Sequence, residues 1–263
     1  MVKLNSDVFI PARLDSIRLP KKHLKKINGE QLIKLLVKRL EKAERIRHVI
    51  VCTTNQKSDD ELISFLEKEN ILTFRGSEKD ILNRFLEAAK YFKTDIIIDV
   101  EGDKIFTDIK YVDKIVDELE NSNYEFITGS TSEKIFEPSA PIHGFIPAGI
   151  KISALQKICD IKKTNNTETG YKEFFASNTL LKKKFITFNE IDLPKNSRFT
   201  IDYPEDLEFA KNIFKILGND FQIKDVVNLI KKQPKLLKII EPIIKQWSEN
   251  YTKQITDLDL DHV

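Results

Sequence analysis

Short apolar runs alternate with amphipathic segments through the first half of the chain. Runs of apolar, often β-branched residues predict strands, and apolar residues three or four positions apart predict helices. Strands are expected at residues 7–12, 48–54, 71–76, 95–103 and 124–130, and helices at residues 30–43, 58–70, 78–92 and 110–120. Strands that alternate with helices of this length form parallel crossovers. We therefore expect a three-layer α/β fold: a mostly parallel, twisted sheet with helices on both faces.

The alternation is less regular after about residue 131. Strands are expected at residues 143–152, 183–191 and 198–203, and helices at residues 153–161, 167–178 and 204–217. The last helix has Pro204 at its start, two acidic residues in its first turn and Gly218 at its end, all typical of helix boundaries. Residues 222–250 predict short helices broken at Pro234 and Pro242. We expect an α/β domain over residues 1–221 and a small C-terminal helical extension over residues 222–263.

The composition is that of a globular protein without a strong charge bias. Of the 263 residues, 41% are hydrophobic, and 43 Lys and Arg stand against 41 Asp and Glu. This balance gives no indication of a nucleic-acid partner. Neither a signal peptide nor an apolar segment of membrane-spanning length is apparent. We expect a cytoplasmic protein that binds neither nucleic acid nor a membrane, and that holds any anion by locally placed cations.

The segment FIPARLDSIRLPKKHL, residues 9–24, places basic side chains directly after the first predicted strand and contains no glycine. Phosphate loops in this position usually bind through the backbone N–H groups of a glycine-rich turn. Here Arg13, Ser16, Arg18, Lys21 and Lys22 follow instead. Arg grips phosphate oxygens bidentately and Lys supplies a point charge, so the segment could span a triphosphate. On spacing alone, a solvated basic turn is an equally good interpretation.

Two aspartates lie at predicted strand ends. Asp103 follows the run IIIDVEG, and Asp202 ends the run FTID. Because the carboxyl ends of parallel strands meet at one edge of a sheet, the two carboxylates could share a Mg²⁺, which also takes substrate phosphate oxygens. The alternative is a turn residue that caps the next helix. Asp206, in the first turn of the following helix, is expected to interact with the helix dipole rather than with a metal.

Two further segments carry weaker signals. In FRGSEKDILNRF, Gly76 and Ser77 close a predicted strand, and Asp80 and Arg84 are four residues apart. This pattern indicates either a ribose or base contact, or an ion pair at the start of a helix. His143 lies among prolines and small residues in the irregular half, where a second substrate could bind.

Taken together, these segments resemble the cytidylyltransferase family that includes CMP-Kdo synthetases, CMP-acylneuraminate synthetases and the spore-coat polysaccharide F type proteins. The run IPARLDSIRLPKKHL is similar to the family pattern IPAR-x-x-S-x-R-L-P-G-K-x-L, with Lys21 in place of the glycine. FRGSEKDILNRF, the Gly-Asp of VEGD, and FTIDYPEDLE are also similar to family motifs, although Ile105 replaces the usual proline after the Gly-Asp. The run FQIKDVVNLIKKQPKLLKI looks like the C-terminal element of the spore-coat subgroup.

The resemblance implies a nucleotide-diphospho-sugar transferase-like fold that moves CMP from CTP to an acceptor oxygen and releases pyrophosphate. It implies a nucleotide-binding half over about residues 1–130 and an acceptor-binding half over about residues 131–221. Catalytic roles fall on Arg13, Lys22, Asp103 and Asp202, the two aspartates being the Mg²⁺ ligands. The substrate-binding residues that it implies are Ala12, Ser16 and Arg18 for the triphosphate, Arg75, Gly76, Ser77 and Asp80 for the nucleoside, and His143, Arg198, Glu168 and Lys172 for the acceptor.

The acceptor that the resemblance favours is a 3-deoxy-ulosonic or nonulosonic sugar acid, used for surface polysaccharide or glycan synthesis. A phosphate or phosphonate acceptor is the first alternative. A metal-dependent glycosyltransferase that uses a nucleotide sugar, or an inactive nucleotide-binding homologue, are the others. The resemblance also suggests a homodimer, with its contact in the irregular middle segment.

Overall fold

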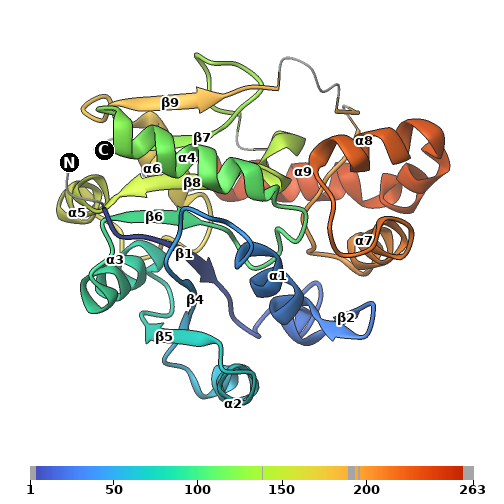
Figure 1. Cartoon of the computed structure of the whole chain (residues 1–263), viewed down its shortest axis with the longest axis horizontal. Helices are drawn as coiled ribbons and strands as arrows, with labels where there is room; N and C mark the ends of the chain where they lie inside the picture. The colour runs from blue at the N-terminus through green and yellow to red at the C-terminus, as the bar shows by residue number, and fades with distance from the viewer. Residues whose placement is uncertain (1–3, 138, 189–192, 195, 257–263) are drawn as a thin grey trace.

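A computed structural model describes residues 4–137, 139–188, 193–194 and 196–256. Its centre is a seven-stranded sheet in the order β5-β4-β1-β6-β8-β7-β9 (Figure 1). Strand β8 is antiparallel to both of its neighbours, and the other strand pairs are parallel. The mostly parallel sheet expected from the sequence is therefore confirmed. The strands are β1 (Ser6–Pro11), β4 (Val49–Thr54), β5 (Leu72–Gly76), β6 (Ile96–Asp99), β7 (Phe126–Gly129), β8 (Ala148–Lys151) and β9 (Lys183–Ile186).

Helices cover both faces of this sheet, and the alternation of side chains along each strand supplies both cores. In β1, Val8 and Ile10 belong to one hydrophobic cluster, whereas Phe9 between them belongs to the other. The first cluster includes side chains of α1 (Leu32–Leu40), α2 (Asp60–Lys68), α4 (Ile109–Asn121), α7 (Pro204–Leu217) and α8 (Ile223–Lys232). The second includes side chains of α3 (Ile81–Phe92), α5 (Ile152–Ile161) and α6 (Tyr171–Ser177).

The remaining elements are short or C-terminal. A two-stranded ribbon of β2 (Lys26–Ile27) and β3 (Glu30–Gln31) precedes α1. Short 3-10 helices are η1 (Lys22–Leu24), η2 (Lys57–Asp59), η3 (Pro141–Gly144) and η4 (Pro234–Ile239), and the last helix is α9 (Glu241–Thr256).

The C-terminal segment is continuous with the main core. Val226, Ile230, Leu236, Ile240 and Ile243 are all buried in the same cluster as the strands and α1. The expected boundary at residue 221 thus marks no gap in the packing. Figure 1 shows α7, α8 and α9 side by side at one end of the molecule.

Several predicted boundaries are corrected by the structure. Residues 198–203 form an extended segment outside the sheet rather than a strand. The sixth strand ends at Asp99, so Asp103 lies in a turn beyond it. The helix predicted from residue 58 begins at Asp60, after the turn η2, and Pro242 lies in the first turn of α9 instead of breaking a helix. Residues 189–191 of the strand predicted at 183–191 lie outside the described residues.

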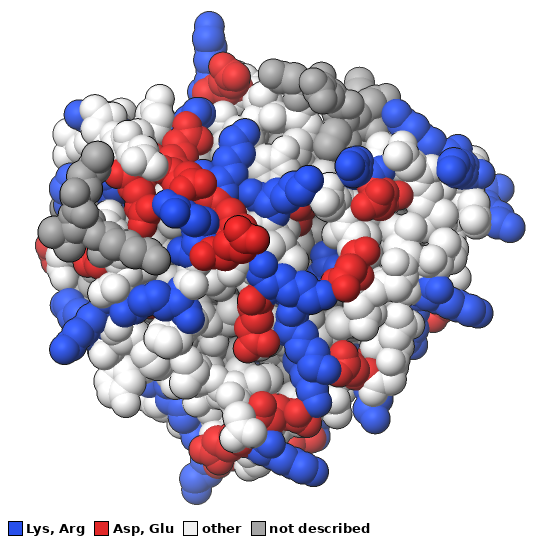
Figure 2. Space-filling view, in the orientation of Figure 1, with Lys and Arg blue, Asp and Glu red and all other residues white. Residues whose placement is uncertain are grey.

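Charged side chains of both signs are interspersed over the face seen in Figure 2. No helix within the described ranges is both long and apolar enough to cross a membrane.

Candidate active site

The loop after β1 contains no glycine, and hydrogen bonds from its backbone amides hold its shape. The Leu14 amide donates to Asp59 Oδ1 at 2.7 Å, and the Lys21 amide donates to the Leu14 carbonyl at 3.3 Å. Lys21 itself has φ 52° and ψ 37°, the left-handed conformation that glycine adopts most readily. A lysine thus holds the backbone shape that the family glycine suggested, and its side chain points away to an ion pair with Glu61.

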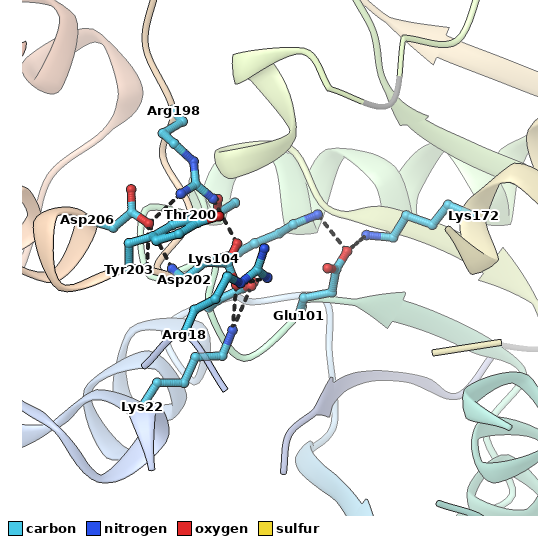
Figure 3. A network of polar contacts seen from close by, with 11 residues as sticks. Arg18, Lys22, Glu101, Lys104, Lys172, Arg198, Thr200, Asp202, Tyr203 and Asp206 are labelled. Atoms are coloured by element: carbon cyan, nitrogen blue, oxygen red, sulfur yellow. Dashed lines mark hydrogen bonds and ion pairs between the residues drawn. The ribbon is translucent and has the colours of Figure 1, made fainter. Parts of the chain in front are cut away.

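The next residue, Lys22, joins the two aspartates singled out in the sequence. Its Nζ lies 3.1 Å from Asp103 Oδ2 and 3.0 Å from Asp202 Oδ1, and all three side chains are largely buried. Arg18 also approaches Asp202 Oδ1, at 3.3 Å. Figure 3 shows Lys22 and Arg18 pointing toward the same carboxylate from one side. The expectation that Asp103 and Asp202 lie close together is therefore met, with a lysine ammonium between them.

Asp202 reaches this position from the N-terminus of α7 and not from a strand. Arg198 binds Asp202 Oδ2 at 2.8 Å and also pairs with Asp206. Asp206 Oδ2 accepts hydrogen bonds from the backbone amides of Asp202 and Tyr203, each at 2.9 Å. Asp206 is thus a helix-start residue, as expected, and Arg198 is a residue that orients Asp202 (Figure 3).

The two carboxylates have opposite electrostatic environments. Burial raises the pKa of Asp202, but Lys22, Arg198 and Arg18 outweigh it and hold that pKa below its ordinary value. For Asp103, burial and the neighbouring Asp202 outweigh Lys22, so its pKa is raised. Asp103 Oδ1 is buried without a hydrogen-bond partner. An unsatisfied carboxylate oxygen is costly to bury, so this atom is the one that could accept a metal ion.

These groups lie in a cavity of about 690 Å³. Among the predicted site residues, the cavity is lined by Ala12, Arg13, Ser16, Arg18, Lys22, Asp103, His143, Glu168, Lys172, Arg198 and Asp202. Residues predicted from both halves of the chain therefore share one space. The cavity opens where β1 and β6 end, as expected for a ligand site of a parallel sheet.

A second charged cluster forms another part of the cavity wall. Lys104 and Lys172 bind Glu101 Oε1 from two sides, at 2.8 and 2.5 Å, as Figure 3 shows. Lys172 also lies 3.1 Å from the buried Asp99, whose carboxylate accepts the Tyr171 hydroxyl at 2.9 Å. Lys172 was a weak candidate in the sequence, and it is firmly placed here by α6.

His143 lines the same cavity from the turn η3. Its Nε2 lies 2.6 Å from the Glu137 carbonyl oxygen, and its ring meets Phe136 edge to face. Burial, with Lys104 nearby, lowers the pKa of His143 to about 3. The imidazole is therefore neutral at physiological pH and faces the cavity as a polar, uncharged group.

The nucleoside candidates are not brought to the cavity wall. Arg75 binds the Thr54 and Gln56 carbonyl oxygens and Asp60. Asp80 caps α3 through the Asn83 amide and pairs with the buried Lys162. Gly76 and Ser77 also lie outside the lining, where Ser77 receives Arg84 on its carbonyl. Glu78, Ile81 and Arg84, at the start of α3, line the cavity in their place.

Other lining residues carried no clear signal in the sequence. Lys104 follows directly on the Gly-Asp motif, where only the aspartate was considered. Trp247, Asn250 and Tyr251 reach the cavity from α9, a helix expected only to dock on the domain. The sequence signal that could have found this helix face is the spacing of Trp247 and Tyr251, four residues apart and therefore on one side of a helix.

A Mg²⁺ would find part of its ligand set here. Within the described ranges, no three His, Cys, Asp or Glu side chains are grouped as a metal site. Mg²⁺ commonly binds one or two carboxylates and completes its shell with water and substrate phosphates. The two carboxylates and the unpartnered Asp103 Oδ1 fit that pattern.

Known proteins share both this sequence pattern and this fold. The family model described as cytidylyltransferase matches residues 8–239. The spore coat polysaccharide biosynthesis protein SpsF of Bacillus subtilis is 26% identical, over 88% of this chain and 96% of its own. A 3-deoxy-manno-octulosonate cytidylyltransferase of Hydrogenovibrio crunogenus is 31% identical over 45% of this chain and 48% of its own.

The fold comparison agrees. The structure of a cytidylyltransferase from Leptospira borgpetersenii superposes with a TM-score of 0.77 and 29% identity, covering 89% of this chain and 97% of that one. The family model matches most of the chain, and the loop lysine and both aspartates meet in one cavity. This chain therefore belongs to the cytidylyltransferase family.

Proposed function

We propose that the chain transfers CMP from CTP to an oxygen of a sugar acid, with Mg²⁺, and releases pyrophosphate. The observation that carries this proposal is the meeting of Lys22, Asp103 and Asp202 at the end of β1 and β6, beside Arg18. In this proposal, Lys22 and Arg18 supply the cations for a triphosphate and the two aspartates supply carboxylates for a metal, in a cavity large enough for two small molecules.

In the proposed reaction, the acceptor oxygen forms a bond to the α-phosphorus as the bond from that phosphorus to the bridging oxygen breaks. The electron pair leaves with pyrophosphate, and the acceptor proton passes to solvent. Lys22 and Arg18 would bind the phosphates and neutralise charge on the leaving group. Arg13, held by Glu168 across the cavity, would exchange that carboxylate for a phosphate oxygen.

Asp103 and Asp202 would hold the metal, with Asp103 Oδ1 as its open ligand atom. A bound Mg²⁺ supplies Lewis-acid polarisation of the phosphate and lowers the pKa of a nearby hydroxyl. Arg198 and Asp206 keep Asp202 in place, so the chain contributes a preorganised carboxylate rather than a mobile one.

The acceptor wall supports an anionic acceptor. Lys104 and Lys172 lie in this wall beside the neutral His143. Both lysines are paired with Glu101, and Lys172 also with Asp99, so an acceptor carboxylate would bind to their remaining N–H donors. Sugar-acid activation is also named for the relative from Hydrogenovibrio crunogenus, a 3-deoxy-manno-octulosonate cytidylyltransferase. We place the nucleoside at the opposite wall, near Glu78 and Arg84.

The test is a screen of CTP, ATP, GTP and UTP against sugar acids, phosphonates and sugar phosphates, with pyrophosphate release as readout. We expect release with CTP and a sugar acid, dependent on Mg²⁺. Release only with a phosphonate or phosphate would assign the other acceptor class. Release of a nucleoside diphosphate from a nucleotide sugar, without pyrophosphate, would identify a glycosyltransferase and contradict the proposal.

A further inference from the structure

The last helix contributes an aromatic wall to the cavity. Trp247 and Tyr251 lie four residues apart in α9, on the same side of the helix, and both line the cavity. Their ring centroids are 5.4 Å apart and their planes differ by 18°, so the rings are stacked. The stacked pair thus contributes aromatic ring surface to this part of the cavity wall.

This surface is anchored to the phosphate side of the cavity. The Arg198 guanidinium lies 4.7 Å from the Trp247 ring centroid, and the same guanidinium holds Asp202. Asn250 Nδ2 donates to the Tyr203 hydroxyl at 3.4 Å, and the Tyr203 ring lies 5.1 Å from the Arg18 guanidinium. The aromatic pair is therefore positioned relative to Asp202 through Arg198.

The other neighbours of the pair belong to the acceptor wall. Tyr251 lines the cavity together with Glu101 and Lys172, and burial, with Glu173 and Glu101 nearby, raises its pKa. We assign the aromatic surface to the acceptor because it shares the cavity with Lys104, Lys172 and His143, which we propose to bind the acceptor.

Resting on the proposed function, we propose that Trp247 and Tyr251 form an acceptor subsite that stacks against the face of a sugar ring. A cyclic sugar has an apolar face of C–H groups and a polar rim of hydroxyls. An aromatic surface packs against that apolar face, and the neighbouring cationic groups bind the hydroxyls and the carboxylate of the sugar acid. The chain therefore selects cyclic sugar acids over open-chain acids of the same charge.

Trp247 is the only tryptophan of the chain, so its emission reports on this subsite directly. The full-length protein is titrated with 3-deoxy-manno-octulosonate and N-acetylneuraminate as cyclic probes. Gluconate is the open-chain control, with a carboxylate and hydroxyls but no ring, and CTP is titrated alone. We expect a saturable change in Trp247 emission with at least one cyclic acid, and little change with gluconate or with CTP alone.

Three results would overturn the subsite: no response to either cyclic acid, an equal response to gluconate, or the whole response from CTP alone. The last would make the aromatic pair a platform for the nucleotide base. A response to a cyclic acid without pyrophosphate release from any nucleotide would instead refute the proposed function while the binding subsite stands.

Kinetic variants provide a second readout. We expect Trp247→Ala and Tyr251→Ala to raise the KM of the sugar acid roughly tenfold, with the KM of CTP within about twofold of wild type. Trp247→Phe should recover most of the loss, because it restores an aromatic face. Lys245→Ala, on an exposed side of the same helix, is the matched control for helix docking.

Unchanged sugar-acid KM in both alanine variants would contradict the proposal. If Trp247→Ala lowers the unfolding midpoint too far to assay, Tyr251→Ala and Trp247→Phe decide. Equal rises in the KM of CTP and of the sugar acid would show a structural role for the pair and would also overturn it.

Discussion

Lys22 Nζ lies about equally far from Asp103 Oδ2 and Asp202 Oδ1, at 3.1 and 3.0 Å, in a largely buried setting. Each carboxylate there depends on a cation for its stability, since an unpaired buried charge is strongly unfavourable. The same ammonium is placed for the phosphates of a triphosphate. Structural and proposed chemical roles therefore coincide in this one side chain.

Neighbouring lysines give a direct comparison. We expect Lys22→Ala to lower kcat/KM for CTP on the order of a hundredfold or more, because it removes charge beside the leaving group. Lys21→Ala should change kcat/KM less than about threefold, because the Lys21 side chain pairs with Glu61 at the surface. Pyrophosphate-release kinetics measure both. Similar losses in the two variants would refute the proposed role of Lys22.

Substitutions of the two aspartates should have similar effects on activity but different effects on the stability of the protein. Asp103→Asn and Asp202→Asn are both expected to lower turnover a hundredfold or more at saturating Mg²⁺. Asp202→Asn should also lower the unfolding midpoint, because Asp202 pairs with Lys22, Arg18 and Arg198. Thermal unfolding and steady-state assays separate the effects. Near wild-type turnover in either variant would show that its carboxylate is not required.

Glu173 should make the protein less stable as the pH rises. Burial, only partly offset by Lys172, raises the pKa of Glu173 to about 7, and its Oε1 has no hydrogen-bond partner. A raised folded-state pKa means that stability is full below about pH 4.5 and falls as the pH rises toward 7. Glu173→Gln should therefore stabilise the protein at pH 8, on the order of 2 kcal/mol, and change little at pH 4.

Denaturant unfolding at the two pH values measures this difference. Glu125→Gln is a control of opposite sign: burial raises the pKa of Glu125, but Lys157 and the Lys182 amide outweigh it and lower that pKa. It should lose stability at neutral pH. A Glu173→Gln variant that is less stable than wild type at pH 8 would contradict the assignment.

At the scale of elements, most strands and helices follow from the hydrophobic pattern. Helix α7 begins at Pro204 and ends at Leu217, as its boundary residues predicted. Residues 198–203 were mistaken for a strand because the apolar Phe199 and Ile201 alternate with polar residues in the sequence. Polar side chains of this segment are buried as well, and its backbone contacts the Asp103 turn, where the Ile201 amide donates to the Asp103 carbonyl, instead of a sheet edge.

The position of α9 could not be read from its sequence. Its pattern showed a helix with an apolar side, but only the tertiary structure brings that side to the cavity. The same limit applied to Arg75, whose carbonyl and ion-pair partners lie between the end of β4 and the start of α2, and to Asp80, whose ion-pair partner Lys162 follows α5. Motif position located Lys22 and Asp103, in the segments that follow β1 and β6, and Asp202, two residues before α7.

Removing residues 222–263 should destabilise the whole fold. The deletion takes Val226, Ile230, Leu236 and Ile240 out of the main hydrophobic cluster, where each is at least nine-tenths buried. We expect an aggregating or unfolded product, in contrast to Lys231→Ala, a surface change on α8. Circular dichroism and solubility report the result. A soluble, folded truncation would show that the segment is an independent extension.

At the scale of the molecule, we propose a homodimer with its contact in the irregular segment after β7. Ile135 and Leu180 are 63% and 79% exposed there, and burying these apolar side chains between two copies of the chain would stabilise a dimer. Light scattering of the full chain should give twice the monomer mass of 30.5 kDa. Ile135→Lys with Leu180→Lys should reduce that mass to the monomer value. A monomeric wild-type chain would refute the dimer.

The whole fold brings a cationic loop, two carboxylates and a helix from the far end of the chain around one cavity. Phosphorus NMR of the complete reaction tests the resulting chemistry most directly. With CTP, Mg²⁺ and a sugar acid, we predict that CTP disappears while pyrophosphate and one new phosphodiester of CMP appear in equal amounts. Persistence of CTP with every acceptor, or release of CDP or free phosphate in place of pyrophosphate, would contradict CMP transfer.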